Sequence, residues 1–97
     1  MLTKERKEKV VAALQKAIQA KSYSGEEKGV VEYLEKLFKD IGYDTVHIDR
    51  YGNIIGCIKG KKNGLKVLMD GHMDTVPVQE EKWKENAFGG EIKDGKI

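Results

Sequence analysis

A histidine flanked by two aspartates, where an apolar run ends, is the part of the sequence best suited to chemistry. Residues 70–77 read Asp-Gly-His-Met-Asp-Thr-Val-Pro and follow the apolar stretch 66–69. In an extended strand, His72 and Asp74 point to the same side, about 7 Å apart at their backbones. A neutral imidazole is a common zinc ligand, and a carboxylate that accepts the hydrogen of its other ring nitrogen fixes the tautomer and raises its basicity. The pattern makes His72 a candidate metal ligand that Asp74 would orient.

The residues alone leave a second interpretation of His72 open, that of a partly buried histidine satisfied by hydrogen bonds. A single imidazole cannot hold a catalytic zinc ion, which normally takes three protein ligands and keeps one position for water. Further ligands must therefore come from elsewhere. Gly71 leaves room for a close approach of backbone and ligand, and Pro77, which cannot donate to a sheet ladder, marks the end of the strand.

Two helices are expected before this segment. Apolar residues recur at helical spacing from about residue 4 to residue 20, and Thr3 is placed to cap the first helix. Ser24 with Glu27 three positions later fits a capping box that opens the second helix. That helix carries apolar residues at i, i+3, i+4 and i+7 over 30–41, and Gly42 follows where a left-handed residue would end it.

Three strands are expected after the helices. Residues 45–49 alternate polar and apolar, residues 51–53 supply a turn, and residues 54–58 and 66–69 are apolar at successive positions. Continuous apolar runs are typical of strands covered on both faces, so we predict a central sheet with helices on both sides. Asp94-Gly95 predicts a tight hairpin turn close to the last residue.

Composition narrows the function classes. The chain has 97 residues, enough for one small domain, and a net charge of +2. The charges of both signs alternate, so nucleic-acid binding is not expected, and we interpret the lysine-rich residues 59–66 as a solvated hairpin tip. One cysteine, no apolar run of about 20 residues and a charged amino terminus lead us to expect a cytoplasmic protein with no membrane partner.

Four other side chains are weaker candidates for a role in catalysis or binding. His47 falls on the polar face of its strand and is expected to be exposed, whereas Cys57 lies among apolar residues and is expected to be inert packing. A nucleophilic pair of these two residues would need a particular hairpin register and a third orienting group. Trp83 and Phe88 are candidates either for lining a substrate cleft or for anchoring their loop to the core, and we favour anchoring.

Residues 71–77 resemble the first metal-site motif of a family of zinc-dependent exopeptidases and deacylases. The family includes acetylornithine deacetylase, succinyl-diaminopimelate desuccinylase, carboxypeptidase G-type enzymes, peptidase T and the aminoacylases. Residues 24–27 are similar to the start of the family's second helix, residues 49–54 to its hairpin turn, and Trp83 with residues 88–96 to the stretch after the motif. Asn86-Ala87 stands where the family usually has an Asp-Pro pair. We therefore expect the loop before Phe88 to differ in shape, with no effect on the metal site.

The resemblance implies that residues 1–97 are the amino-terminal part of a three-layer α/β/α catalytic domain with a mixed central sheet. It implies that His72 ligates one ion of a two-zinc centre, with Co²⁺ or Mn²⁺ as alternatives, and that Asp74 is the active-site residue that orients it. The intact protein is then expected to hydrolyse an amide bond in a small peptide or N-acyl amino acid, with a homodimer as one arrangement. The family's bridging aspartate and glutamate base have no match here, so this segment alone is expected to be inactive.

A function of another class also fits the sequence. A sheet cut in mid-hairpin leaves open edges, and open edges favour pairing with a second chain. On this alternative, the 97 residues form a non-catalytic, truncated α/β piece that acts, if at all, by self-association or by binding a partner.

Overall fold

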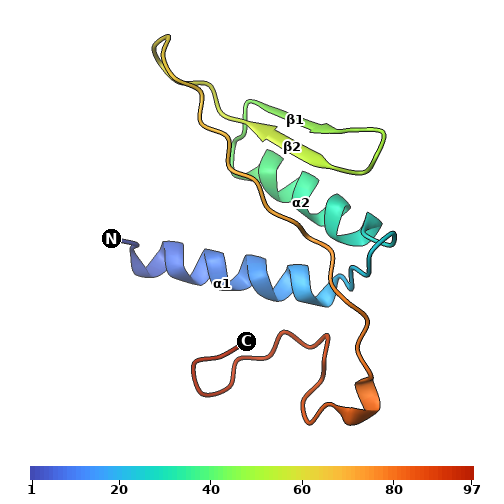
Figure 1. The fold of residues 1–97 in the computed structure, drawn as a ribbon. Helices are drawn as coiled ribbons and strands as arrows, with labels where there is room; N and C mark the ends of the chain where they lie inside the picture. Colours follow the sequence, from blue (N-terminus) through green and yellow to red (C-terminus); the bar gives the residue numbers. More distant parts are fainter.

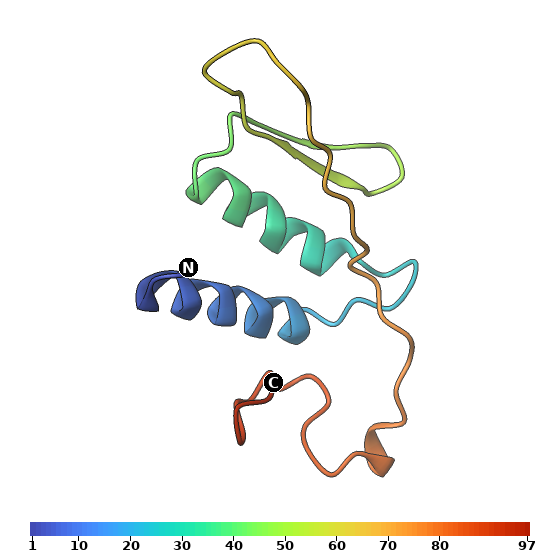
Figure 2. The same ribbon diagram turned by 60° about the vertical axis from the view of Figure 1, so that its left-hand side comes forward.

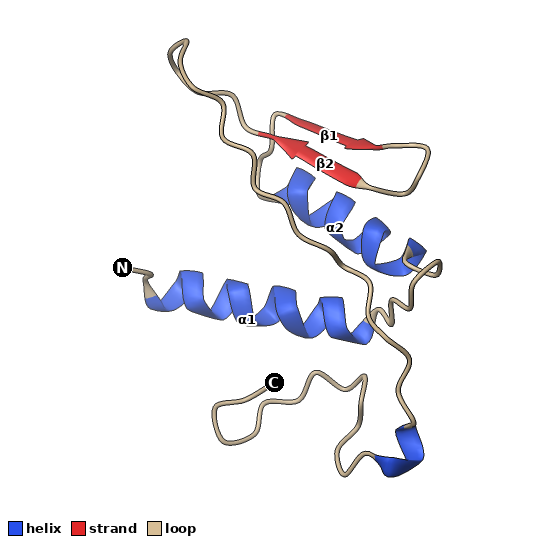
Figure 3. Ribbon diagram, viewed as in Figure 1, coloured by secondary structure: helices blue, strands red, loops and turns tan.

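The chain forms a stack in which the second helix lies between a β-hairpin and the first helix. The computed structural model describes residues 1–97. Its elements are α1 (Lys4–Gln19), α2 (Lys28–Asp40), β1 (Thr45–Ile48), β2 (Ile54–Cys57) and one 3-10 turn, η1 (Glu80–Lys82). The helix α2 contacts both strands and α1, whereas α1 does not contact the strands (Figures 1 and 3). The architecture is α/β, as the sequence predicts.

Helix α1 begins where its capping residue predicts. The hydroxyl of Thr3 accepts a hydrogen bond from the backbone N–H of Arg6 at 3.2 Å, which satisfies one of the free donors of the first turn. The expected apolar face is less covered than its spacing suggests: no residue of α1 is buried, and Val10 and Leu14 are 58% and 48% exposed. One side of α1 therefore lacks a packing partner.

Helix α2 ends as expected but does not begin as expected. Gly42 has φ +93°, and its N–H donates to the carbonyl of Lys39 while the N–H of Tyr43 donates to that of Phe38, which is the Schellman arrangement that glycine permits. The predicted capping box is wrong: α2 starts at Lys28, and the Ser24 hydroxyl does not cap it. Its only buried residues, Val30 and Val31, form the core of the chain.

The hairpin forms at the expected place and is covered on one face. β1 and β2 pair antiparallel with Ile48 opposite Ile54, and α2 packs against both strands. The expectation of cover on both faces is wrong, because Ile55 is 51% exposed and Cys57 is exposed as well. Successive strand residues point to opposite faces, and the chain supplies no layer for the outer one. Cys57 is therefore not the packed side chain that its apolar neighbours suggest.

The hairpin turn is closed by one carboxylate. Asp49 accepts hydrogen bonds from the backbone N–H groups of Tyr51 and Asn53, each at 2.9 Å, and from the side-chain amide of Asn53 at 2.9 Å. Gly52 adopts φ +87° in this turn, a conformation that glycine adopts without steric cost. These hydrogen bonds hold the pKa of Asp49 below its ordinary value, and the bond from the Asn53 side chain has the largest effect.

The predicted third strand does not form. Residues 66–69 have no regular structure, and Leu65, Val67, Leu68 and Met69 are 100%, 85%, 88% and 89% exposed. A strand of continuous apolar residues needs paired neighbours and a covering layer on each face, and the chain offers neither at this position. The segment instead runs past α2 towards the carboxyl end of α1 (Figures 1 and 2).

The final residues fold back beneath α1. The predicted tight turn is present: Lys93 and Lys96 exchange backbone hydrogen bonds of 2.9 and 3.0 Å around Asp94 and Gly95, whose φ values of 50° and 73° are both positive. Such values are those of the two-residue hairpin turn that Asp-Gly favours. A short hairpin bridge therefore closes this segment near α1.

The surface of the chain is much larger than a folded monomer of its mass requires. Its accessible area is 8713 Å² at 10.9 kDa, whereas the size scaling of monomeric proteins gives about 5,600 Å². The radius of gyration of 15.7 Å likewise exceeds the value of about 13 Å for a compact chain of this length. Apolar side chains account for part of the excess. No helix combines the length and the apolar character needed to cross a bilayer.

Candidate active site

The connection between the two helices fixes the backbone that carries His72 and Asp74. Ser22 is buried, its hydroxyl donates to the carbonyl of Met73 at 2.8 Å, and its own carbonyl accepts from the N–H of Thr75 at 2.8 Å. Tyr23 and Thr75 form a parallel β-bridge. These bonds satisfy polar groups at the one place where the segment meets the core. Ser22 and Tyr23 carry no sequence signal for this contact, and Ser24 was expected to cap α2.

His72 and Asp74 lie in direct contact, as their spacing predicts. The Nδ1 atom of His72 is 3.0 Å from Oδ1 of Asp74 and 3.0 Å from the backbone carbonyl oxygen of the same residue. Both of these atoms are acceptors, so Nδ1 carries the ring hydrogen in the neutral imidazole. The His72 side chain is 85% exposed, which leaves Nε2 with its lone pair at the surface. The alternative of a buried, satisfied histidine does not fit this geometry.

The carboxylate of Asp74 is bound on both oxygens. Its Oδ2 atom accepts a hydrogen bond of 2.6 Å from the hydroxyl of Ser24, and its Oδ1 atom faces His72. The Ser24 bond first, and the His72 bond second, lower the pKa of Asp74 from its ordinary value. The group is therefore a carboxylate at neutral pH and acts as an acceptor for the imidazole.

The donor set fits one ligand of a metal centre and no more. An imidazole whose Nδ1 is held by a carboxylate and whose Nε2 is free is the usual form of a metal-bound histidine. No group of three or more His, Cys, Asp or Glu side chains comes close enough together to hold an ion, and His47 is exposed on β1, as expected. A catalytic zinc site needs about three protein ligands, so the chain by itself does not complete one.

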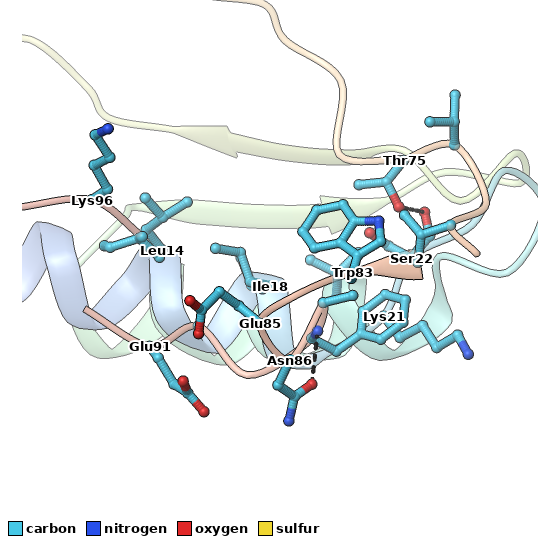
Figure 4. Close-up of a pocket in the computed structure, with 18 of the residues that line it drawn as sticks. Leu14, Ile18, Lys21, Ser22, Thr75, Trp83, Glu85, Asn86, Glu91 and Lys96 are labelled. Carbon is cyan, nitrogen blue, oxygen red and sulfur yellow. Dashed lines mark hydrogen bonds between the residues drawn. The ribbon is translucent and has the colours of Figure 1, made fainter. Parts of the chain in front are cut away.

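A cavity of about 1110 Å³ extends from the His72 segment along α1 to the last residues. Leu14 and Ile18 of α1 and Trp83 of the following loop project into it (Figure 4). Both aromatic residues line this cavity. Trp83 is 53% exposed, whereas Phe88 also packs edge to face on Tyr23 with ring centroids 5.9 Å apart. The anchoring role that we favoured for both aromatic residues therefore describes Phe88 better than Trp83.

Two glutamines on successive turns of α1 hold the far side of this loop. The side-chain amide of Gln15 donates to the carbonyl of Gly90 at 2.8 Å, and that of Gln19 donates to the carbonyl of Gly89 at 2.9 Å. Asn86, where the sequence departs from the family pattern, accepts a bond from the N–H of Phe88 at 3.1 Å and shapes the turn. Neither glutamine could be identified from the sequence, because polar residues on an exposed helix face carry no distinguishing pattern.

Comparison with known proteins finds related hydrolases. No family model and no solved structure matches the chain. It is 39% identical to a LysW-lysine/LysW-ornithine hydrolase of Pyrococcus furiosus over 70 residues. This match covers 72% of this chain and 21% of the relative. It is 32% identical over 88 residues to a succinyl-diaminopimelate desuccinylase of Cereibacter sphaeroides, 88% of this chain and 23% of the relative. An acetylornithine deacetylase of Buchnera aphidicola is 33% identical over 66 residues, 63% of this chain and 16% of the relative.

The chain belongs to the exopeptidase and deacylase family of these hydrolases. It spans about a fifth of the length of the curated relatives it matches. The relatives are therefore several times longer than the 97 residues described above. This difference agrees with the large uncovered surface of the chain and with the single candidate ligand it carries.

Proposed function

We propose that this chain supplies one metal ligand, His72, and its orienting carboxylate, Asp74, to a hydrolase that cleaves an amide bond in a small peptide or N-acyl amino acid. The observation that carries the proposal is the contact of 3.0 Å between Nδ1 of His72 and Oδ1 of Asp74 in a ring that is 85% exposed. This contact leaves Nε2 free to bind an ion. Names of the relatives support the class of reaction, since they describe removal of a succinyl group from diaminopimelate and of an acetyl group from ornithine.

The residues of this chain would prepare the ligand and hold it in place. Asp74 keeps the hydrogen on Nδ1 and offsets the positive charge that ligation places on the ring. The bonds of Ser22 to the backbone of Met73 and Thr75 keep the segment from moving away from the helices. His72 would hold a divalent ion whose Lewis acidity would polarise the scissile carbonyl and activate a water molecule. The general base and the other ligands would come from other parts of the intact enzyme.

We further propose that residues 1–97 lie within a three-layer α/β/α catalytic domain. The chain exposes about 3,100 Å² more surface than the scaling for a folded monomer of its mass predicts. Ile55 and Cys57 on the uncovered face of β2, and four of the five residues 65–69, are exposed and apolar, as residues of a central sheet are before helices cover them. Additional strands and a further helical layer would bury these surfaces.

The test uses the complete enzyme, with N-acetylornithine and N-succinyl-diaminopimelate as substrates. Release of acetate or succinate is measured in the metal-free enzyme and after addition of Zn²⁺, Co²⁺ or Mn²⁺. We expect activity to require metal and His72→Ala to abolish it together with part of the bound metal. We expect Asp74→Asn to weaken metal binding roughly 10- to 100-fold.

A matched control is available on β1. His47→Ala removes the only other histidine of the chain, which is also exposed, and it is expected to leave both metal content and turnover unchanged. Full activity and full metal content in His72→Ala would contradict the proposal. Equal losses in the His47 and His72 variants would also contradict it, because they would show a general effect of histidine loss.

The isolated 97 residues are expected to bind zinc only weakly. One imidazole with one carboxylate falls short of the ligand number that a zinc site requires. Isothermal titration of the chain with zinc checks this expectation, and micromolar affinity that disappears in His72→Ala would overturn it.

Self-association is a second candidate function, favoured by one observation. The backbone of residues 65–69 is not paired in a sheet, and Leu65, Val67, Leu68 and Met69 are each at least 85% exposed. Unpaired apolar segments of this kind favour pairing with another chain. A chain that stays monomeric and folds cooperatively without metal would remove this candidate.

A further inference from the structure

We propose that Ser24 is a positioning residue for His72 and acts through the carboxylate of Asp74. The hydroxyl of Ser24 donates to Oδ2 of Asp74 at 2.6 Å, while Oδ1 of the same carboxylate lies 3.0 Å from Nδ1 of His72. The three side chains form a continuous hydrogen-bonded series from the helix connection to the imidazole. The inference rests on the proposed function, because it assigns Ser24 to the site in which His72 would bind a metal ion.

The arrangement of the carboxylate shows why a second donor matters. A carboxylate on the surface can rotate about its side-chain bonds, and Asp74 is 39% exposed. A strong donor on Oδ2 restricts that rotation and leaves Oδ1 as the oxygen that faces the ring. Bonds to a charged acceptor are shorter and stronger than bonds between neutral groups, which agrees with the separation of 2.6 Å from Ser24.

The backbone around Ser24 is itself fixed. Gly25, with φ +86°, donates its N–H to the carboxylate of Glu27 at 2.9 Å. On the other side, buried Ser22 is bonded to the backbone of Met73 and Thr75. The hydroxyl is therefore supplied by a turn that is held on both sides, and it approaches Asp74 from a part of the chain 50 residues away.

The start of α2 agrees with this role of Ser24. Ser24 and Glu27 have the spacing of a capping box, in which the serine hydroxyl would accept a helical N–H. In the structure this hydroxyl donates to Asp74, the helix begins only at Lys28, and the side chain of its N-cap residue, Glu27, makes no capping hydrogen bond. The serine thus serves the carboxylate in place of the helix that its sequence position suggests.

The tautomer of His72 gives a direct test that involves no metal. The complete protein is prepared metal-free with ¹⁵N-labelled histidine and studied by NMR at about pH 8.5, where an ordinary imidazole is neutral. The His72 signals are assigned by their loss in His72→Gln, and His47 serves as an internal reference. Wild-type protein is expected to carry the hydrogen on Nδ1. Ser24→Ala is expected to lower the ratio of the Nδ1–H to the Nε2–H tautomer roughly three- to tenfold.

Two controls separate positioning from a general disturbance. Thr75→Val removes a hydroxyl from the same junction without touching the carboxylate, since the Thr75 side chain lies near the carbonyl of Ser22, and it should leave the ratio unchanged. Ser24→Thr keeps a hydroxyl and should restore the wild-type ratio, whereas Ser24→Val, of nearly the same shape, should not. This pair replaces Ser24→Ala if that variant loses its fold.

An unchanged tautomer ratio in folded Ser24→Ala, or equal ratios in the threonine and valine variants, would overturn the assignment. A crystal structure of the wild-type protein with the Ser24 hydroxyl turned away from Asp74 would do the same. Because the measurement is made without metal, its failure leaves the proposed metal site standing. A failure of metal binding at His72 would, in turn, leave the tautomer result intact.

Discussion

Replacing Gly56 with alanine is expected to loosen the hairpin from α2. Gly56 lies in β2, opposite Val46, where the strand crosses the aromatic pair of Phe38 and Tyr43. The two rings are stacked, with centroids 4.5 Å apart and an angle of 9° between their planes. A Cβ atom on Gly56 would lie 2.5 Å from Cδ1 of Tyr43 and 2.7 Å from Cδ2 of Phe38. Neither distance is tolerated, so at least one ring must move.

The size of the effect follows from two opposing terms. Overpacking of this kind costs about 1–3 kcal/mol, and three contacts below 3.0 Å with two aromatic rings place Gly56→Ala in the upper part of that range. Alanine also restricts the unfolded chain relative to glycine, which returns about 0.4–1 kcal/mol. The net loss is therefore about 1–2 kcal/mol, which corresponds to a roughly 5- to 30-fold increase in the population of the opened hairpin.

Amide hydrogen exchange measures this opening where it occurs. The N–H groups of Asp44 and Asp49 donate across the hairpin to the carbonyls of Cys57 and Asn53, so their exchange rates report on strand pairing. Both rates should rise by the stated factor in Gly56→Ala. Gly64→Ala is the matched control, because a Cβ there meets nothing within 4 Å, and it should leave both rates unchanged.

A second substitution checks the cause. In a Tyr43→Leu background, the added methyl group of Gly56→Ala has more space, so its further effect on exchange should be smaller than in the wild type. The reasoning is refuted if Gly56→Ala leaves hairpin exchange at the wild-type rate, or if its effect is the same size in both backgrounds.

Three further predictions concern other parts of the chain. Gly90→Ala should destabilise the final loop by about 1–3 kcal/mol, seen as faster exchange or proteolysis there, because Gly90 has φ +62° and a Cβ would lie 3.0 Å from the carbonyl of Gln15; equal protection in the variant would contradict this. Hydrogen bonds led by Asn53 lower the pKa of Asp49, so their stabilisation is complete above the ordinary aspartate pKa and lost as pH falls through the lowered value; NMR of the turn should show acid opening that Asp49→Asn makes independent of pH. Leu68→Lys should reduce self-association of the 97-residue chain in light scattering, since it charges an exposed apolar segment; an unchanged mass distribution would show that association does not use this segment.

Local signals in the sequence identified the start of α1, the end of α2 and the final turn correctly. Thr3 caps α1, Gly42 ends α2, and Asp94-Gly95 forms a hairpin turn. Each of these features depends on residues within a few positions of one another, and their backbone preferences need no distant partner. The contact between His72 and Asp74 is of the same kind, because a spacing of two in an extended segment brings two side chains to one side.

Features that depend on distant residues were missed or mistaken. Ser24 has the same local pattern whether it caps a helix or binds a carboxylate, and only the position of Asp74, 50 residues later, decides between the two. Cys57 and residues 66–69 have the apolar neighbours of a covered strand, yet cover depends on layers that the chain does not contain. Hydrophobic pattern therefore shows which surfaces need a partner without showing where that partner is.

The junction between residues 22–24 and 73–75 also has a consequence for how the protein assembles. It closes a loop of about fifty residues that contains α2 and the whole hairpin. We expect such a closure to come late in folding, because contacts between residues near in sequence form faster than contacts between distant ones. The entropic free-energy cost of closing a flexible loop grows slowly, by about 0.6 kcal/mol for each doubling of the loop length. Evolution can therefore lengthen the lysine-rich tip between β2 and His72 while the geometry of the imidazole is kept.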